Sequence, residues 1–472
     1  MVHGMKTSAA FHRAVTAAAL VMCGATCATS QTAVSRMTLL HTRYELRMGE
    51  PAEILAPRET VDFLVHAKTR RVTMEGQETS GLVVAANQSQ DRILIAPTFK
   101  AKPGEYTVTL SATSETGEER QTTLSVVVRP RASVPNATAR PPVVLLNGWQ
   151  SGLTNSCAVA TTSATTFGNL AQYLVSDGVP AVYLFDNCLE GANQTIEVLA
   201  NNLGAFLNSI KYDDGTQVAQ IDLIGYSLGG LIARTYLAGM QPNQTYTPPA
   251  NTLVRKLVLI ATPNFGSFVV GNYVNTITAG TQGAELAPGS AFLWNLATWN
   301  QRGDDLRGID AIAIAGNAGT FTPTLSSSTV LSNASDGLVS LTSASLGFAY
   351  QKSSATRIVP YCHLDQAAFT STSLGTFTCG AAGIANVTSE SHNTSQIIRS
   401  FLAGTTAWSS IGTSPASDRY LAKNGGMFFA FQAANGNYVQ DLTQVAWGTV
   451  PLQNGGDSGT IFYHSCPKQQ LL

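Results

Sequence analysis

Hydrophobic residues follow two different patterns along the chain, and the first is an alternation. Between about residues 36 and 128, apolar and polar positions alternate in short runs, for example at 92–96, 106–110 and 122–128. Turn-forming residues separate these runs. Alternation with a period of two is typical of strands that bury one face. Residues 31–130 are therefore predicted to form an all-β sandwich.

The second pattern consists of apolar runs that alternate with helical stretches. These runs lie at 143–146, 181–185, 221–224, 257–260 and 311–314. Apolar strands of this kind are typical of a parallel sheet that is covered by helices on both faces. Residues 142–404 are therefore predicted to form an α/β domain. The preceding segment, 131–141, is rich in proline and small polar residues, and we predict a linker there that forms neither strand nor helix.

Short β-type runs return after residue 404. Two of them, 427–431 and 438–442, lie next to turns rich in glycine and asparagine. Such spacing is typical of hairpins. Residues 405–472 are therefore predicted to form a small C-terminal β module.

The N-terminus is predicted to be a secretory signal peptide over residues 1–30. Lys6 and Arg13 precede the apolar stretch 14–22, and small residues follow up to Ser30. Such a stretch is too short to cross a bilayer but matches the length of a signal sequence. The protein is therefore expected to be secreted, in the periplasm or outside the cell.

An oxidising compartment would allow the cysteines to form disulfides. Two of the seven cysteines fall in the predicted signal peptide. Cys157 and Cys188 each follow a predicted parallel strand at the same edge of the sheet, so they are predicted to pair. Cys362 and Cys379 would close a short loop, and Cys466 is left without a partner.

Charge argues against a nucleic-acid partner. Charged residues make up 12% of the chain and the formal net charge is −1, whereas about a quarter of residues are charged in an ordinary globular protein. No basic run is present that could attract a polyanion.

Candidate chemistry is concentrated in the pentapeptide Gly225-Tyr226-Ser227-Leu228-Gly229, which follows an apolar run and precedes a helix-forming stretch. A serine in such a strand–turn–helix unit holds its hydroxyl above the sheet, and glycines avoid the clashes that a Cβ would make. Ser227 is therefore the predicted nucleophile. The segment resembles the nucleophile turn of the α/β-hydrolase superfamily, which implies the α/β-hydrolase fold.

Backbone donors for an oxyanion are expected on two segments. The N–H of Leu228, directly after the nucleophile, is the first. The loop 146–150 resembles the His-Gly-X loop of α/β-hydrolase lipases, with Asn147 in the place of the histidine. This resemblance implies that Trp149 supplies the second N–H.

A hydrolytic serine also needs an acid and a base. Asp336 follows the fifth apolar run and precedes two candidate histidines, which is the chain order of hydrolases. His363 lies in a His-Leu-Asp segment that resembles that of Pseudomonas-type secreted lipases, whose acid also lies in an Asp-Gly-Leu-Val segment. His392 instead precedes a helical stretch that resembles the final helix of many esterases. Both stay candidates for the base, and His363 is favoured because it follows an apolar strand at the edge expected to carry Ser227.

Two further segments resemble parts of lipases. Residues 261–267 are similar to the Thr-Pro-His-X-Gly-Ser segment, and residues 285–293 are similar to the lid region. The insertion 264–309 is rich in aromatic and aliphatic residues. It is predicted to be a lid that contacts an acyl chain, and its alternative is a segment packed permanently in the core.

Outside the α/β domain, residues 103–110 resemble the penultimate strand of bacterial immunoglobulin-like modules, which implies an immunoglobulin-like sandwich.

Together these features favour a secreted serine carboxylic-ester hydrolase, lipase-like, with a lipid or other acyl ester as substrate. Transient contact with a lipid interface is compatible with this function, and the oligomeric state is left open. The alternatives are an amidase or thioesterase with the same residues, or a non-catalytic surface-binding protein that works through its two β modules. No cofactor is expected. Asp365 resembles a calcium ligand of the Pseudomonas-type lipases, but no second ligand is assignable and no metal is predicted.

Overall fold

A computed structural model was obtained for the whole chain. The structure describes the following residues: 35–36, 41–49, 52–55, 63–71, 81–86, 92–114, 119–136, 138–149, 166–187, 194–267, 269–270, 276–288, 290–298, 306–323, 335–346, 355–364, 375–381, 383, 388–389, 391–411, 448–451 and 460–463.

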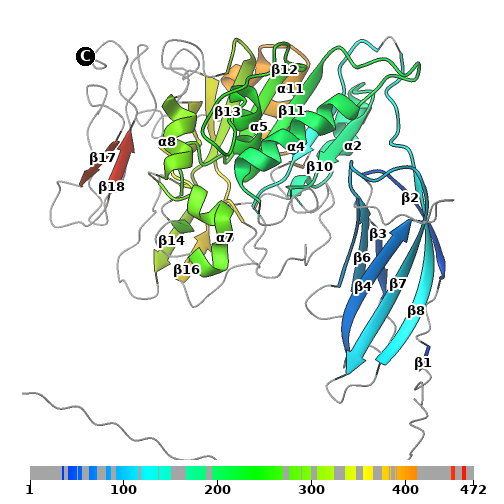
Figure 1. Cartoon of the computed structure of the whole chain (residues 1–472). Helices are drawn as coiled ribbons and strands as arrows, with labels where there is room; N and C mark the ends of the chain where they lie inside the picture. The colour runs from blue at the N-terminus through cyan, green and yellow to red at the C-terminus, as the bar shows by residue number, and fades with distance from the viewer. Residues whose placement is uncertain are drawn as a thin grey trace, which may run out of the picture.

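A six-stranded parallel sheet forms the centre of the molecule (Figure 1). Its strand order is β10-β9-β11-β12-β13-β15, and each neighbouring pair is parallel. The strands are β9 (Val143–Leu146), β10 (Val182–Phe185), β11 (Ile221–Tyr226), β12 (Val254–Ile260), β13 (Asp310–Gly316) and β15 (Thr356–Val359). The prediction of an α/β fold from apolar runs is confirmed.

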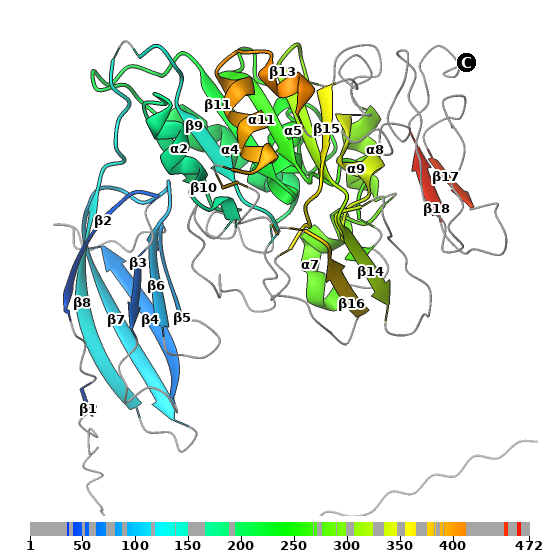
Figure 2. The same ribbon diagram turned by 180° about the vertical axis from the view of Figure 1, so that it is seen from behind.

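Helices cover both faces of this sheet, and two core clusters record the alternation of side chains along each strand. Val144 and Leu146 of β9 belong to the first cluster, together with α4 (Ile196–Ser209), α5 (Leu228–Ala238) and α8 (Ala291–Thr298). Val143 and Leu145 belong to the second, together with α2 (Leu170–Ser176) and α11 (Asn393–Leu402). Figure 2 shows the second face, where α2 and α11 lie over the strands. Because both faces are buried, every position of β9 is apolar.

Several shorter elements complete the part around the sheet. They are α7 (Thr276–Glu285), α9 (Leu341–Ala344), the 3₁₀ helix η5 (Ala407–Ser410), and the antiparallel pair β14 (Gly319–Pro323) and β16 (Gly375–Cys379).

The N-terminal part consists of two small sheets. One holds β1 (Ser35–Arg36), β2 (Arg43–Arg47), β4 (Phe63–Arg71), β7 (Gly104–Ser114) and β8 (Glu119–Arg129), and the other holds β3 (Ala52–Leu55), β5 (Leu82–Ala86) and β6 (Arg92–Pro97). Ile95 from the smaller sheet and Tyr106 and Val126 from the larger one are buried in one core cluster. The immunoglobulin-like assignment of this part stays a prediction.

The proline-rich linker is attached to the α/β part through an isolated β-bridge. Val134 is fully buried, its N–H donates to the carbonyl of Lys211 at 2.9 Å, and its own carbonyl accepts from the N–H of Asp213 at 2.9 Å. These bonds form a parallel bridge between Val134 and Tyr212. This bridge is isolated and belongs to no strand, and Val134 can form it because it precedes Pro135 and keeps its own N–H donor. The assignment of 131–141 as a linker stays a prediction.

Several predictions fall outside the described residues. They concern the signal peptide 1–30, the cysteines Cys157, Cys188 and Cys466, and the C-terminal runs 427–431 and 438–442. In the C-terminal part the structure describes one antiparallel pair, β17 (Gly448–Pro451) with β18 (Thr460–Tyr463). Among the described helices, none combines the length and the hydrophobicity needed to cross a bilayer.

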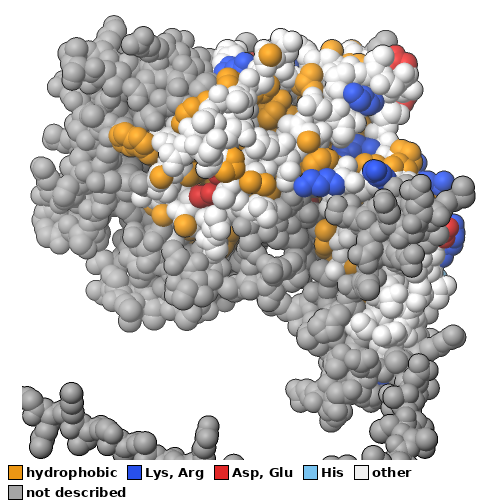
Figure 3. Space-filling model, in the orientation of Figure 1, with side chains coloured by type: hydrophobic (Ala, Val, Ile, Leu, Met, Phe, Trp, Pro, Cys, Tyr) orange, Lys and Arg blue, Asp and Glu red, His pale blue; other side chains and the backbone are white. Residues whose placement is uncertain are grey.

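Charged side chains are sparse on the face of the α/β part that Figure 3 shows, in keeping with the low charged fraction of the sequence.

Candidate active site

Ser227 lies in the sharp turn between β11 and α5. Its backbone has φ 51° and ψ −121°, a conformation that is strained for a residue with a side chain. Its N–H donates to the carbonyl of Ile260 at 2.8 Å, which ties the turn to the end of the neighbouring strand. The residue is only 7% exposed. The turn therefore holds the serine hydroxyl in one place at the carboxyl edge of the sheet.

The glycines on either side of Ser227 are required by close packing. A Cβ on Gly225 would lie 2.6 Å from the Cα of Gly230, and a Cβ on Gly229 would lie 2.3 Å from the carbonyl oxygen of Leu146. Real Cβ atoms do not approach backbone so closely. The pattern that singled out Ser227 in the sequence is thus a steric condition for this turn.

His363 lies between Ser227 and Asp336. Its Nε2 is 3.0 Å from Ser227 Oγ, and its Nδ1 is 2.8 Å from Asp336 Oδ2. Because a carboxylate only accepts, the hydrogen-bond network assigns the ring proton to Nδ1 and leaves Nε2 as an acceptor for the serine hydroxyl. The imidazole is 5% exposed. This geometry allows a proton to pass from Ser227 to His363.

Asp336 is completely buried, and backbone donors fix its second oxygen. Oδ1 accepts from the N–H groups of Leu338 at 3.0 Å and Val339 at 2.7 Å. The carbonyl of Asp336 also accepts from the N–H of His363 at 2.9 Å. The carboxylate is therefore held in one orientation toward the imidazole.

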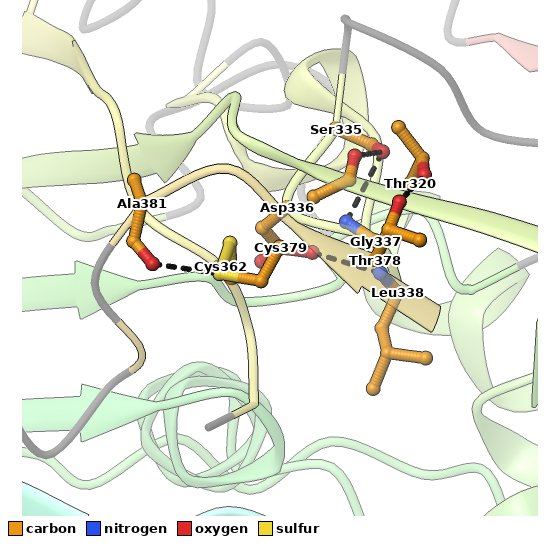
Figure 4. The surroundings of a disulfide bond; sticks show 10 residues. Thr320, Ser335, Asp336, Gly337, Leu338, Cys362, Thr378, Cys379 and Ala381 are labelled. Carbon is orange, nitrogen blue, oxygen red and sulfur yellow. Dashed lines mark hydrogen bonds between the residues drawn. A yellow bond between two sulfur atoms is a disulfide. The ribbon is translucent and has the colours of Figure 1, made fainter. Parts of the chain in front are cut away.

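The predicted disulfide Cys362–Cys379 is formed, with an S–S distance of 2.01 Å, and it lies next to this network (Figure 4). Cys379 is the last residue of β16, which pairs with β14, and Gly319 at the start of β14 forms a parallel bridge with Asp336. The disulfide thus connects the residue before His363 to a strand pair that contacts the Asp336 loop.

His392, the second candidate base, has a different position. It is the N-cap residue of α11, and its Nδ1 accepts from the N–H of Thr394 at 3.2 Å. Of the two histidines, the structure brings His363 to Ser227 and uses the ring of His392 to cap a helix.

The two predicted oxyanion donors lie on either side of the serine turn. Leu228 is the first residue of α5, where N–H groups have no partner within the helix. Trp149 follows β9, and a Cβ on the preceding Gly148 would lie 3.2 Å from the Cβ of Ser227. The loop that carries Trp149 therefore passes directly beside the candidate nucleophile.

Two residues that the sequence analysis did not single out also belong to the site. The hydroxyl of Tyr226 donates to the carbonyl of His363, and the two rings lie with centroids 5.1 Å apart. The side-chain amide of Asn187 donates to the carbonyls of Asn147 and Gly148. Tyr226 stands inside the serine pentapeptide and could have been considered there, whereas no motif marks Asn187.

The described apolar residues of the predicted lid are packed in the core. Phe265, Val270, Phe292 and Leu293 are all buried in the cluster that contains α4 and α5, while Trp294 is 39% exposed. This packing corresponds to the alternative reading of the segment. Movement of the lid stays a prediction.

A pair of acids, the buried Glu197 and the half-buried Glu285, lies at the N-terminus of α4. Glu285, at the end of α7, accepts from the N–H of Ile196 at 2.9 Å. Burial, together with the nearby Glu197, raises the pKa of Glu285 to about 8. Gln282 donates to the carbonyl of Gln194 at 3.0 Å, so α7 is attached to the start of α4 at two points.

Within the described residues, no group of three or more acidic, histidine or cysteine side chains is arranged to hold a metal ion. Asp365, the residue that resembles a calcium ligand, lies outside them.

One comparison with known proteins matches a lipase family. Residues 140–309 match the family described as lipase (class 2). A structure of phospholipase PlaB from Legionella pneumophila is 17% identical with a TM-score of 0.31, and the alignment covers 43% of this chain and 44% of that one, so this chain spans less than half of that protein. PcoC, a methionine-rich copper resistance protein from Escherichia coli, is 14% identical with a TM-score of 0.17 over 20% of this chain and 100% of that chain. A search of curated proteins returned no match. The match of residues 140–309 supports a lipase-like hydrolase.

Proposed function

We propose that the protein is a serine carboxylic-ester hydrolase, lipase-like, that forms an acyl-enzyme on Ser227. One observation carries the proposal: His363 Nε2 lies 3.0 Å from Ser227 Oγ while its Nδ1 lies 2.8 Å from Asp336. Nucleophile, base and orienting acid in this order of contact form the arrangement that activates a serine hydroxyl.

The reaction would proceed in two halves. Ser227 Oγ bonds to the ester carbonyl carbon while its proton passes to His363 Nε2, and the N–H groups of Leu228 and Trp149 donate to the oxyanion. His363 then gives the proton to the departing alcohol, which leaves the acyl group on Ser227. A water molecule gives a proton to His363 while its oxygen bonds to the acyl carbon. The bond from that carbon to Ser227 Oγ then breaks, Oγ takes the proton from His363, and the carboxylic acid is released. Asp336 stays ionised and stabilises the imidazolium in both halves.

The family match and the geometry support different parts of this machinery. The match over residues 140–309 includes Trp149, Ser227 and Leu228. Asp336 and His363 lie beyond it, and their assignment rests on their distances to each other and to Ser227. Agreement between a family match for the nucleophile and a contact network for its partners is stronger than either alone.

We also place the protein outside the cytosol. The N-terminal segment 1–30 has the charge and hydrophobicity of a signal peptide. The disulfide Cys362–Cys379 supports this location, because disulfides persist in oxidising compartments and are rare in the cytosol.

Hydrolysis of p-nitrophenyl esters, from acetyl to palmitoyl, tests the proposal. Ser227→Ala and His363→Ala should each lower kcat by about 10⁵- to 10⁶-fold, as removal of either residue does in other serine hydrolases. His392→Ala is the matched control: it should keep its activity and lose about 1 kcal/mol of stability as a helix cap. The ester-hydrolase proposal fails if wild type and Ser227→Ala are equally inactive on every ester. Activity confined to an amide or thioester series would favour the alternative enzyme classes.

A further inference from the structure

Asn187 contacts the loop after β9 through both protons of its side-chain amide. Nδ2 donates to the carbonyl of Asn147 at 2.9 Å and to the carbonyl of Gly148 at 2.8 Å. Both partners are carbonyl oxygens, which only accept, so the atom that faces them must be the amide nitrogen. Asn187 is 2% exposed. These two bonds are therefore shielded from water.

The register of the sheet brings these residues together. Strands β9 and β10 are parallel neighbours, with Leu146 opposite Phe185. Two residues further along each strand direction stand Gly148 and Asn187. Asn147 completes the connection, since its Oδ1 accepts from the N–H of Asn187 at 3.1 Å and its Nδ2 donates to Asp186 at 3.3 Å. The residue that replaces the histidine of the lipase loop is thus part of the same network.

Because a peptide unit is planar, the bond from Asn187 to the Gly148 carbonyl also sets the direction of the Trp149 N–H. The carbonyl of Gly148 and the N–H of Trp149 belong to one planar trans peptide unit, so they point in opposite directions. Holding that carbonyl toward Asn187 fixes the direction of the Trp149 N–H away from Asn187. The carbonyl of Asn147 fixes the Gly148 N–H in the same way.

We infer that Asn187 is a positioning residue that aims the Trp149 N–H at the oxyanion of the reaction. The inference rests on the proposed ester hydrolysis. Asn187 touches no reacting atom and acts through the loop. An oxyanion donor works only when it is already oriented before charge develops, because reorientation during the reaction would take up the stabilisation it provides. A displaced donor should therefore lower kcat without weakening substrate binding.

Two substitutions of Asn187 reduce the number of protons that its side chain can donate to the loop after β9. Asn187→Asp keeps the side-chain volume but has no proton to give and places a charge beside two carbonyls. Asn187→Ser keeps one donor. The expected order of kcat is wild type, then Ser, then Asp, with a loss of about 10- to 100-fold for the Asp variant, as expected for a misplaced catalytic group. KM and the pH dependence of kcat should stay at wild-type values, because neither the acyl site nor His363 is changed.

The matched control is Asn201→Ala. Asn201 is exposed on α4, and its side-chain amide exchanges hydrogen bonds with Gln241 instead of with the β9 loop. It should leave kcat unchanged. A purely structural role for Asn187 would make kcat follow thermal stability instead of donor number, and this outcome would overturn the inference.

Hydrogen exchange of the peptide that spans 145–149 separates this inference from the proposed function. Exchange should be faster in both Asn187 variants than in wild type or Asn201→Ala. If exchange and kcat match wild type in the Asp variant, Asn187 positions nothing. A third outcome is that neither wild type nor any variant hydrolyses an ester, but exchange still rises in the Asn187 variants. The hydrolase proposal then fails, and Asn187 holds the loop without a role in catalysis. If the Asp variant does not fold, the Ser variant, which keeps a single donor, tests the inference through the same measurements of kcat and hydrogen exchange.

Discussion

The two ends of strand β11 carry polar groups that differ in how far the protein pairs them. At its start, Asp222 is 1% exposed and accepts from Arg255 through both oxygens, while the Arg255 guanidinium also donates to the carbonyl of Leu402 at 2.9 Å. Just past its end, Ser227 is held at φ 51°. Burial raises the pKa of Asp222, although Arg255 favours its charged form.

The difference lies in what the protein leaves unpaired. At the Asp222 end, the charged groups bind one another and the backbone, so the cluster is closed. At the Ser227 end, no acceptor among the described residues takes the N–H of Leu228 or of Trp149. Buried donors are normally paired within the protein. Within the described residues, the Ser227 end departs from this rule at Leu228, which is fully buried.

Among the changes that test this comparison, the largest effect is expected from Asp336→Asn. It keeps the shape of the side chain but removes the charge that stabilises the His363 imidazolium, and it places a donor beside Nδ1. We expect kcat to fall by about 10⁴-fold on esters. Thermal unfolding should change little, since the backbone donors Leu338 and Val339 still find the retained oxygen. A fall in stability large enough to explain the lost activity would contradict this assignment.

The second effect should appear at the other end of the strand. Asp222→Ala leaves Arg255 without its buried partner and should destabilise the protein by about 3–5 kcal/mol. The kcat of the folded fraction should stay at the wild-type value, measured below the unfolding transition. Asp310→Ala is the control. The ion pair of Asp310 with Lys256 is partly open to solvent, at 56% exposure of the aspartate, and its loss should lower stability by less than about 1 kcal/mol.

The effect that is smallest per pH unit concerns the pair of Glu285 and Glu197 beside α7, which lies at neither end of β11. Burial and the neighbouring Glu197 raise the pKa of Glu285 from 4.5 to about 8. The folded state thus binds the proton more tightly than the unfolded chain. This contribution to stability is complete below about pH 4.5 and is lost as pH rises to about 8, at no more than about 1.4 kcal/mol per pH unit. Glu285→Gln should flatten this part of the stability curve. Thermal melts from about pH 4 to about pH 9, a range that includes both pKa values, would measure the change. A variant with the wild-type slope would show that another group titrates.

The sequence predicted the central sheet well because inner strands such as β9 and β11 are buried on both faces. An apolar run such as 143–146 leaves few alternatives, and β9 has those bounds. The N-terminal part is more difficult, because alternation indicates strands but does not determine which of them pair. β2 pairs with β8 in parallel, for example, across a wide separation in the chain.

The candidate site was predictable as a set of residues but not as a geometry. Chain order selected Ser227, Asp336 and a histidine as a candidate set, yet His363 and His392 satisfy that order equally. Only the distance to Ser227 separates them, and distance depends on how the chain leaves β15. Asn187 carries no motif, since its role arises from the register between two strands.

The buried attachment of Val134, together with contacts close to it, has a consequence for how the protein unfolds. Phe99, from the N-terminal part, lies with its ring centroid 6.1 Å from that of Phe206 on α4, and the Arg131 guanidinium lies 4.0 Å from the same ring. Removing residues before 142 would strip α4 of these contacts and leave apolar surface facing water. The contacts between the N-terminal sheets and the α/β part thus stabilise both, and removing either part would lower the free energy of unfolding of the other. The N-terminal sheets and the α/β part should therefore unfold in one cooperative transition instead of two separate ones.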